Sequence, residues 1–335
     1  MIKVLVVDDS ALMRRILTDI IRSDSEIKVV DIASNGKLAI EKIKVHGPDI
    51  VLMDIEMPEM DGITALKQIM REWPLPVIML SSHTESGKAI EAIQAGAVDF
   101  IVKPTNEFDT IRDEIIIKIK TAALARLARF KQARAQTHRF NSTRKKIVII
   151  ATSTGGPQTL EALLTELPKN IPASILIVQH MPPYFTKSLA ERLNTICQIE
   201  VKEAQEGDEL KVGTALIAPG GFHMELKAEF LGAEGKIRLN KEPPELGVRP
   251  CANKLFKSVA PIFKENTIAV VLTGMGTDGT EGCVDVKKFN GTVIAEAEKS
   301  CIIYGMPKSV IERGLVDEII DIDTMAVALV QLLDV

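Results

Sequence analysis

The sequence predicts an α/β protein of two domains, each built on a mostly parallel sheet. At 335 residues the chain is too long for one ordinary domain and suits two. Short apolar runs alternate with amphipathic segments in both halves, which is typical of strands alternating with helices. Hydrophobic residues make up 46% and charged residues 26%, so each half can build an apolar core and whole-chain disorder is excluded.

The first domain is expected over residues 1–121. Its predicted strands are Lys3–Val7, Val29–Ala33, Ile50–Met53, Val77–Leu80 and Phe100–Val102, with helical patterns between and after them. Five strands with intervening helices predict a parallel sheet covered on both faces. The carboxyl ends of such strands meet at one edge, where ligands bind.

A basic linker is expected over residues 122–145, helical at its start and flexible afterwards. Residues 115–146 carry ten basic and no acidic side chains, whereas the flanking regions are both acidic. A nucleic-acid-binding arm is the alternative, but no recognition-helix pattern accompanies it. We therefore expect contact with the acidic faces of the chain's own domains and no nucleic-acid partner.

The second domain is expected over residues 146–335. Its predicted strands are Ile147–Ala151, Ile175–Gln179, Thr214–Ala218, Ile268–Thr273 and Thr292–Ala295. Its predicted helices are Gln158–Leu167, Lys187–Leu193, Ala252–Phe263, Thr280–Phe289 and Thr324–Leu333. The result is a doubly wound, mostly parallel sheet, and the Gly- and Pro-rich stretch 219–250 predicts a small β-hairpin insertion.

The four cysteines lie far apart and form no C-x-x-C pair, which predicts buried free thiols instead of a zinc site or disulfides. No run of about 18 apolar residues and no signal-peptide pattern occurs in the sequence. We therefore expect a cytoplasmic protein without membrane insertion.

Three carboxylates are predicted to converge in the first domain. Asp8 and Asp9 end its first strand and Asp54 ends its third. Such a cluster repels itself unless a hard cation neutralises it, and Mg²⁺ fits oxygen ligands best. Ser81 and Lys103 follow the fourth and fifth strands and could bind the oxygens of an acyl phosphate. Any one polar residue at a strand end could merely solvate a loop, but five of these types are less easily accidental.

These positions resemble the response-regulator receiver family. The matching segments are Val-Val-Asp8-Asp9-Ser, Leu-Met-Asp54-Ile-Glu-Met-Pro58, Met-Leu-Ser81-Ser82 and Val-Lys103-Pro104. The resemblance covers residues 1 to about 120 and implies a flavodoxin-like fold with Asp54 as the phosphorylated residue. It implies that Mg²⁺ is held by Asp9, Asp54 and the Glu56 carbonyl, with Asp8 assisting through water. Ser81 and Lys103 would bind the phosphoryl group.

Phe100 stands where the receiver family has an aromatic that changes rotamer on phosphorylation. A packed core phenylalanine explains the residue equally well.

A serine on a sharp turn is the candidate nucleophile of the second domain. Ser153 follows the first strand in Ala151-Thr-Ser-Thr-Gly-Gly-Pro157, where backbone N–H groups at a helix start could bind an oxyanion. The loop could instead cradle a phosphate, or Ser153 could be only a helix cap. The loop around Ser153 contains neither G-x-G-x-x-G nor G-x-x-x-x-G-K-[ST], which disfavours nucleotide binding there.

A serine nucleophile needs a base and an orienting carboxylate. His180 follows the second strand of this domain and is the leading base among five histidines. His223 could line the pocket, although a solvated turn is the favoured interpretation. Asp278, in a Gly-rich turn after an apolar strand, is the candidate carboxylate. The order Ser, His, Asp and the absence of G-x-S-x-G differ from the α/β-hydrolases, which implies a different fold.

The second half resembles the chemotaxis protein-glutamate methylesterases over residues 146–335. The matching segments are Ser153-Thr-Gly-Gly, Val-Gln-His180-Met-Pro, Leu-Thr-Gly-Met-Gly-Thr-Asp278-Gly and Tyr304-Gly-Met-Pro-Lys. The resemblance implies that Ser153 is the nucleophile, His180 the base and then acid, and Asp278 the group that fixes the imidazole tautomer.

It further implies that Thr154, Gly155 and Met275 form the oxyanion and substrate pocket, with the Met275 N–H as a donor, and that Arg249 is a pocket arginine. Two departures from the family pattern are Asn253, where an acidic residue is usual, and Ala151-Thr152 before the nucleophile.

The implied activity is hydrolysis of glutamate γ-methyl esters on methyl-accepting chemotaxis receptors, with deamidation of receptor glutamines as a related reaction. A chemotaxis histidine kinase would phosphorylate the receiver, and the change would expose the Ser153 site. No cofactor is expected for the esterase reaction. The alternative is a response regulator whose second domain is a non-catalytic partner-binding or DNA-associated module.

Overall fold

The computed structural model describes residues 1–82, 85–103, 108–125, 145–228 and 235–334, and it divides into two compact units, Met1–Leu127 and Ala128–Val335. Most of the predicted linker, residues 126–144, therefore lies outside the described residues. None of the described helices combines the length and the apolar character that crossing a membrane requires.

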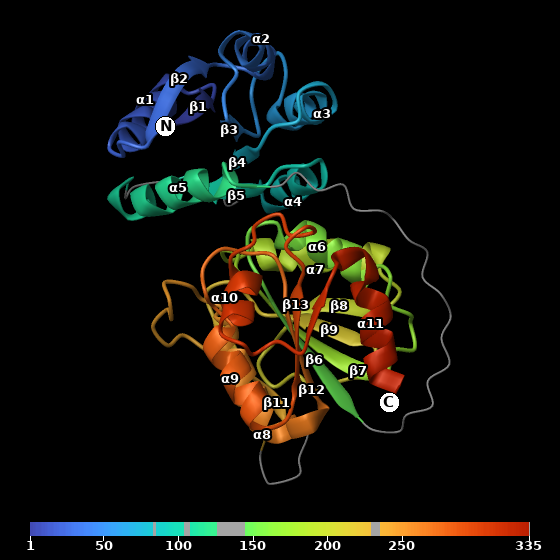
Figure 1. The fold of residues 1–335 in the computed structure, drawn as a ribbon. Coiled ribbons are helices and arrows are strands. Elements are labelled where there is room, and N and C mark those ends of the chain that lie inside the picture. The colour runs from blue at the N-terminus through green and yellow to red at the C-terminus, as the bar shows by residue number, and fades with distance from the viewer. Residues whose placement is uncertain (83–84, 104–107, 126–144, 229–234, 335) are drawn as a thin grey trace. The chain divides into compact units, whose positions relative to one another are not determined.

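The first unit is a five-stranded parallel sheet flanked by helices (Figure 1), as predicted. Its strands are β1 (Ile2–Val7), β2 (Ile27–Ala33), β3 (Ile50–Asp54), β4 (Val77–Ser81) and β5 (Asp99–Val102). Its helices are α1 (Ala11–Arg22), α2 (Gly36–His46), α3 (Gly62–Glu72), α4 (Ser86–Gln94) and α5 (Phe108–Ala122). Polar side chains cap the first turns of α1, α2 and α3, which explains where these helices begin.

The order of this sheet is β2-β1-β3-β4-β5. The order reverses at β1, because β2 and β3 lie on opposite sides of it. A crevice forms outside the carboxyl ends of the strands at such a switch point. The ends of β1 and β3 are therefore the expected ligand site.

The second unit holds a seven-stranded parallel sheet of order β14-β13-β12-β6-β7-β9-β8. Its strands are β6 (Lys146–Thr152), β7 (Ala173–Gln179), β8 (Glu200–Glu203), β9 (Thr214–Ile217), β12 (Thr267–Val271), β13 (Thr292–Glu296) and β14 (Glu318–Ile320). The five predicted strands are all present. The edge strands β8 and β14 were not predicted, because they are short and contain exposed polar residues.

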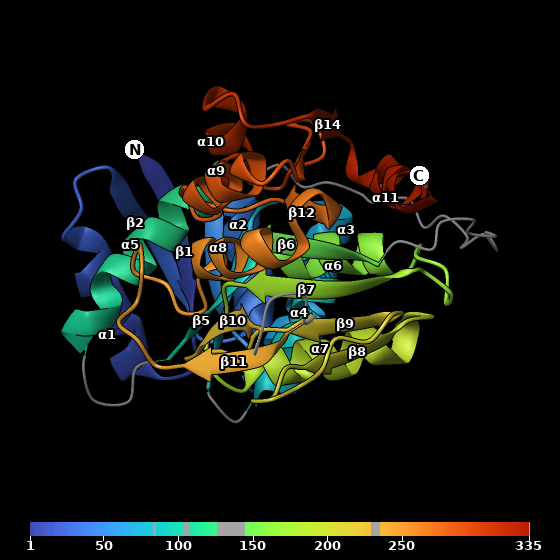
Figure 2. The same ribbon diagram turned by 90° about the horizontal axis from the view of Figure 1, so that it is seen from below.

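Helices cover both faces of this sheet (Figures 1 and 2), as a doubly wound fold requires. They are α6 (Gly156–Leu164), α7 (Phe185–Ile196), α8 (Ala252–Phe263), the 3-10 turn η2 (Lys264–Asn266), α9 (Thr280–Lys288), α10 (Met306–Glu312) and α11 (Ile322–Asp334). Helix α6 packs on α7 and α11, whereas α9 packs on α8 and α10. Helix α10 was not predicted from the sequence.

The predicted hairpin insertion is an antiparallel pair, β10 (His223–Lys227) and β11 (Lys236–Asn240). It packs on α8 and adds Met224, Leu226 and Ile237 to the core. The cysteines are free, as predicted, and Cys197 alone among the four is only partly buried.

Glycine at the start of α3 lets the helix approach Asp54. A Cβ added to Gly62 would lie 1.9 Å from the backbone oxygen of Asp54, whereas one added to Gly87 in α4 meets nothing within 4 Å. We expect Gly62→Ala to lower the free energy of unfolding of the first unit by about 2 kcal/mol through overpacking. Gly87→Ala, the matched control, should leave it unchanged or raise it by up to about 1 kcal/mol.

Urea unfolding followed by tryptophan fluorescence measures this difference, because Trp73 is the only tryptophan and lies in the first unit. Equal effects of the two substitutions would contradict the steric argument.

Candidate functional site

Three carboxylates meet at the carboxyl edge of the first sheet. Asp8 and Asp9 follow β1 and Asp54 is the last residue of β3, and one oxygen from each lies within 4.8 Å of the others. Asp8 and Asp54 are only 0% and 3% exposed. Buried carboxylates this close are costly without a compensating cation. An all-oxygen cluster of this kind fits Mg²⁺.

Lys103 supplies part of the compensating charge. Its Nζ lies 2.9 Å from Asp8 Oδ2 and 2.7 Å from Asp54 Oδ1. Burial raises the pKa of Asp54 to about 6, and the charges of Asp8 and Asp9 add to the rise while Lys103 opposes it. The backbone of Lys103 donates to the Ser81 carbonyl over 2.8 Å, so the structure brings Ser81 to the same edge.

A cavity of about 640 Å³ lies over the cluster, and Glu56 and Lys88 are among the residues that line it. The Glu56 side chain pairs with Lys88. Phe100 is 2% exposed in β5, and Lys118 Nζ lies 5.4 Å from the centroid of its ring. This packing agrees with a core phenylalanine, and the switch role of Phe100 stays a prediction.

Arg14 holds the acidic loop and was missed in the sequence analysis. Its Nη1 donates to the backbone carbonyls of Asp8 over 2.7 Å and Asp9 over 3.0 Å. The signal that could have found it is an arginine in the first turns of the helix that follows the acidic strand end.

In the second unit, the residues predicted for hydrolysis follow three neighbouring strands, β12, β6 and β7. Thr152 of β6 and Gln179 of β7 are register partners, and Ser153 and His180 each follow by one residue. The His180 N–H donates to the Thr152 carbonyl over 3.1 Å. Asp278 lies in the connection from β12 to α9. All three residues are therefore at the carboxyl edge beside β6, where the strand order reverses.

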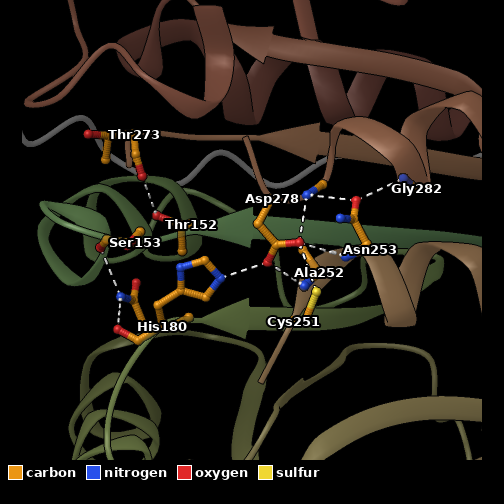
Figure 3. Close-up of polar contacts among 11 residues, drawn as sticks. Thr152, Ser153, His180, Cys251, Ala252, Asn253, Thr273, Asp278 and Gly282 are labelled. Carbon is orange, nitrogen blue, oxygen red and sulfur yellow. Dashed lines mark hydrogen bonds and ion pairs between the residues drawn. The ribbon is translucent and has the colours of Figure 1, made fainter. Parts of the chain in front are cut away.

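The imidazole of His180 bonds directly to Asp278. Its Nε2 lies 2.7 Å from Asp278 Oδ2, and both side chains are largely buried. Figure 3 shows the ring between Ser153 and Asp278, with its other nitrogen on the side of Ser153. Among the described residues, no hydrogen bond joins the Ser153 hydroxyl to this ring. Catalytic contacts of this kind are often long without substrate and tighten when it binds.

The Asp278 carboxylate is surrounded by hydrogen-bond donors. They are the His180 ring, the Cys251 thiol, and the backbone N–H groups of Ala252, Asn253 and Gly279. Burial alone would raise the pKa of Asp278, but these bonds, led by that of His180, hold it at about 2. The carboxylate is therefore ionised at neutral pH, so Nε2 carries the ring proton and Nδ1 can accept one.

The turn that carries Ser153 is bonded to the end of β12. The Ser153 N–H and the Thr152 hydroxyl both donate to the Thr273 carbonyl over 3.0 Å. A Cβ added to Gly274 would lie 2.8 Å from the Ser153 Cβ, so only glycine allows this approach. Gly155 caps α6 with a φ of 79°, in the left-handed region.

Gln179 links the turn to the histidine and was also missed. Its Nε2 donates to the Ser153 carbonyl over 2.8 Å and to the His180 carbonyl over 3.2 Å. Its position directly before His180 was the available signal, but a glutamine at a strand end indicates nothing specific by itself.

The remaining predicted residues are placed as follows. Thr154 is buried, whereas the Met275 side chain is 42% exposed beside the close approach at Gly274. The Arg249 Nη1 donates to the backbone carbonyls of Lys241 and Glu242 after β11. Contacts of these residues with substrate stay predictions.

The solvated-turn interpretation of His223 is wrong. This side chain is 0% exposed in β10, and its Nε2 lies 3.1 Å from the Pro243 carbonyl. The hairpin packs on α8, and this packing buries the His223 side chain. Burial lowers the pKa of His223.

Comparisons with known proteins match both units. Residues 148–329 match the family model described as CheB methylesterase, and residues 4–115 match the response regulator receiver domain. A protein-glutamate methylesterase/protein-glutamine glutaminase of Halalkalibacterium halodurans is 46% identical over 98% of each chain. One of Thermotoga maritima is 48% identical over 95% of each chain.

The crystal structure of the Thermotoga maritima CheB methylesterase catalytic domain aligns with a TM-score of 0.54 and 48% identity. It covers 57% of this chain and 100% of its own. These names support the hydrolytic interpretation and not the non-catalytic alternative.

The raised pKa of Asp54 makes the stability of the first unit depend on pH. Between its ordinary value of 3.8 and about 6, the folded protein keeps a proton that the unfolded chain has released. The free energy of unfolding should therefore fall as pH rises from about 4 to about 7, by roughly 3 kcal/mol in metal-free buffer. Asp54→Asn should remove this slope.

Urea unfolding followed by Trp73 fluorescence at several pH values provides the measurement. Asp19→Asn, at an exposed carboxylate, is the control and should keep the slope. If Asp54→Asn keeps the wild-type slope, the pH dependence does not come from the raised pKa of Asp54.

Proposed function

Because the chain belongs to the CheB methylesterase family, whose named members are hydrolases, we propose that it is a phosphorylation-activated protein-glutamate methylesterase acting on methyl-accepting chemotaxis receptors. Its receiver domain spans residues 1–121, its linker 122–145 and its catalytic domain 146–335. The single observation that supports the hydrolytic role most is the hydrogen bond between His180 and Asp278. His180 and Ser153 each lie one residue beyond the last paired residues of β7 and β6.

In the proposed reaction, the Ser153 hydroxyl attacks the ester carbonyl of a receptor glutamate while His180 Nδ1 takes its proton. The tetrahedral intermediate collapses as the imidazolium returns the proton to the leaving methoxide, and methanol departs. Water, deprotonated by His180, then cleaves the acyl-serine to free glutamate and restores Ser153. The ionised Asp278 keeps the ring tautomer fixed and stabilises the imidazolium in both halves.

Backbone N–H groups near Thr154, Gly155 and Met275 are assigned to the oxyanion, and Arg249 to the substrate pocket. The same steps on a glutamine side chain release ammonia in place of methanol, which gives the deamidase activity. This chemistry uses no cofactor.

In the receiver, Asp54 is the proposed phosphoacceptor and a chemotaxis histidine kinase the phosphodonor. Asp9, Asp54 and the Glu56 carbonyl would hold Mg²⁺, with Asp8 binding through water, and the ion supplies positive charge to the transferred group. Ser81 and Lys103 bind the phosphoryl oxygens. Phe100 changes rotamer as Ser81 moves, and the resulting shift activates the esterase in the cytoplasm.

Ser153→Ala should lower methanol release from methylated receptor membranes by about 1,000-fold or more, because the nucleophile is lost. Circular dichroism should show the same fold. Ser188→Ala, which removes a hydroxyl that donates to the Tyr184 carbonyl at the start of α7, should keep wild-type activity. Full activity in Ser153→Ala would exclude the proposed mechanism.

Acetyl phosphate with Mg²⁺ should label the protein and raise its rate of methanol release. Asp54→Asn should abolish both effects because the acceptor oxygen is gone, whereas Asp19→Asn should keep both. Intact mass spectrometry follows the labelling and the methanol assay follows the activation. Labelling that persists in Asp54→Asn would place the phosphoryl group elsewhere.

A further inference from the structure

The carboxylate of Asp278 is oriented by four contacts besides the imidazole. The first turn of α8 donates two backbone N–H groups, at 2.6 Å from Ala252 and 3.0 Å from Asn253. The Cys251 thiol lies 3.0 Å and the Gly279 N–H 2.8 Å from Oδ1. Both carboxylate oxygens are therefore held, and their plane determines where the His180 ring lies (Figure 3).

The helices α8 and α9 exchange their N-terminal caps. The residues that precede them, Cys251 and Gly279, make no side-chain cap bond to their own helix. Asp278, just before α9, instead accepts from the first N–H groups of α8. In return, Asn253 Oδ1 accepts from Gly279 over 3.0 Å and from Gly282, in the first turn of α9, over 2.9 Å. Loss of one cap therefore releases the segment that supplies the other.

The four groups that donate to this carboxylate besides the imidazole are neutral. The Gly279 N–H donates both to Asn253 Oδ1 and to Asp278 Oδ1, so the side-chain oxygens of these two residues share one donor. Burial raises the pKa of the Cys251 thiol, so the thiol stays protonated and donates. Burial also keeps nearby Cys283 in α9 protonated by raising its pKa.

We propose that Asn253 and Cys251 are positioning residues of the esterase reaction, which act by holding the Asp278 carboxylate against the His180 ring. Neither needs to contact the substrate. Asn253, which departs from the family pattern, has a defined role in this geometry as the cap of α9. The inference rests on the proposed function, since a positioned imidazole matters only if it serves a nucleophile.

The decisive comparison is between variants that keep and lose the acceptor or donor. Asn253→Ala should lower kcat for methanol release by about 10-fold or more and leave KM within about 2-fold, because misplacement acts on the chemical step. Asn253→Asp keeps an acceptor oxygen and should restore kcat to within about 3-fold of wild type. Cys251→Ala should lower kcat about 3-fold or more, and Cys251→Ser, which keeps a donor, should restore it.

A second readout does not depend on activity. In the full chain, the proton on His180 Nε2 should give a downfield NMR resonance, assigned by its loss in His180→Gln. Asn253→Ala and Cys251→Ala should shift or broaden it, whereas Asn253→Asp and Cys251→Ser should keep it. If Asn253→Ala does not fold, the Cys251 pair decides the question.

Wild-type kcat and an unchanged resonance in both alanine variants would overturn the inference, as would a change confined to KM. An equal loss in the alanine and the conservative variants would also overturn it. Absence of methanol release from the wild type, measured in parallel with Ser153→Ala, would instead refute the proposed function and leave the resonance test standing.

Discussion

The 2.7 Å hydrogen bond between His180 and Asp278 is the interaction on which the hydrolytic site depends. It sets the proton on Nε2 and leaves Nδ1 as the acceptor on the side of Ser153. Helix packing determines which ring nitrogen carries the proton, because groups at the starts of α8 and α9 hold the carboxylate in place. The sheet supplies the imidazole and the hydroxyl from adjacent strands. The hydrolytic site therefore lies between the carboxyl ends of the strands and the N-termini of α8 and α9.

Each unit has a buried carboxylate near a strand end, and the pKa values of the two carboxylates are shifted in opposite directions. Asp54 lies beside two other acids, and its pKa is raised to about 6 by burial and by their charges. Asp278 is equally buried but receives five donors, and its pKa falls to about 2. Burial alone does not decide the outcome, because the balance of neighbouring donors and acids does. The ionised form of Asp54, the proposed phosphoacceptor, is therefore destabilised, whereas the ionised form of Asp278 is stabilised.

Sequence reasoning found the strand-end residues because the parallel-sheet rule needs only the order of strands and helices. That rule places Asp8, Asp54, Ser153 and His180 without any side-chain geometry. It could not find residues whose role is a contact between distant segments, such as Gln179. The burial of His223 was missed for the same reason, since the hairpin covers it only after folding onto α8. The short edge strands β8 and β14 lack the apolar run that identifies central strands.

In the hydrolytic site, the Asp278–His180 pair is held by hydrogen bonds, whereas the Ser153 hydroxyl makes no hydrogen bond to the ring among the residues described. The Asp278 carboxylate accepts five hydrogen bonds, one of them from the imidazole. This division follows from what each half must do. The tautomer has to be set before substrate arrives, because rotating a buried carboxylate during the reaction would cost its donors. In the proposed reaction the Ser153 hydroxyl attacks the ester carbonyl, and the glycine at position 274 leaves the space beside Ser153 without a side chain.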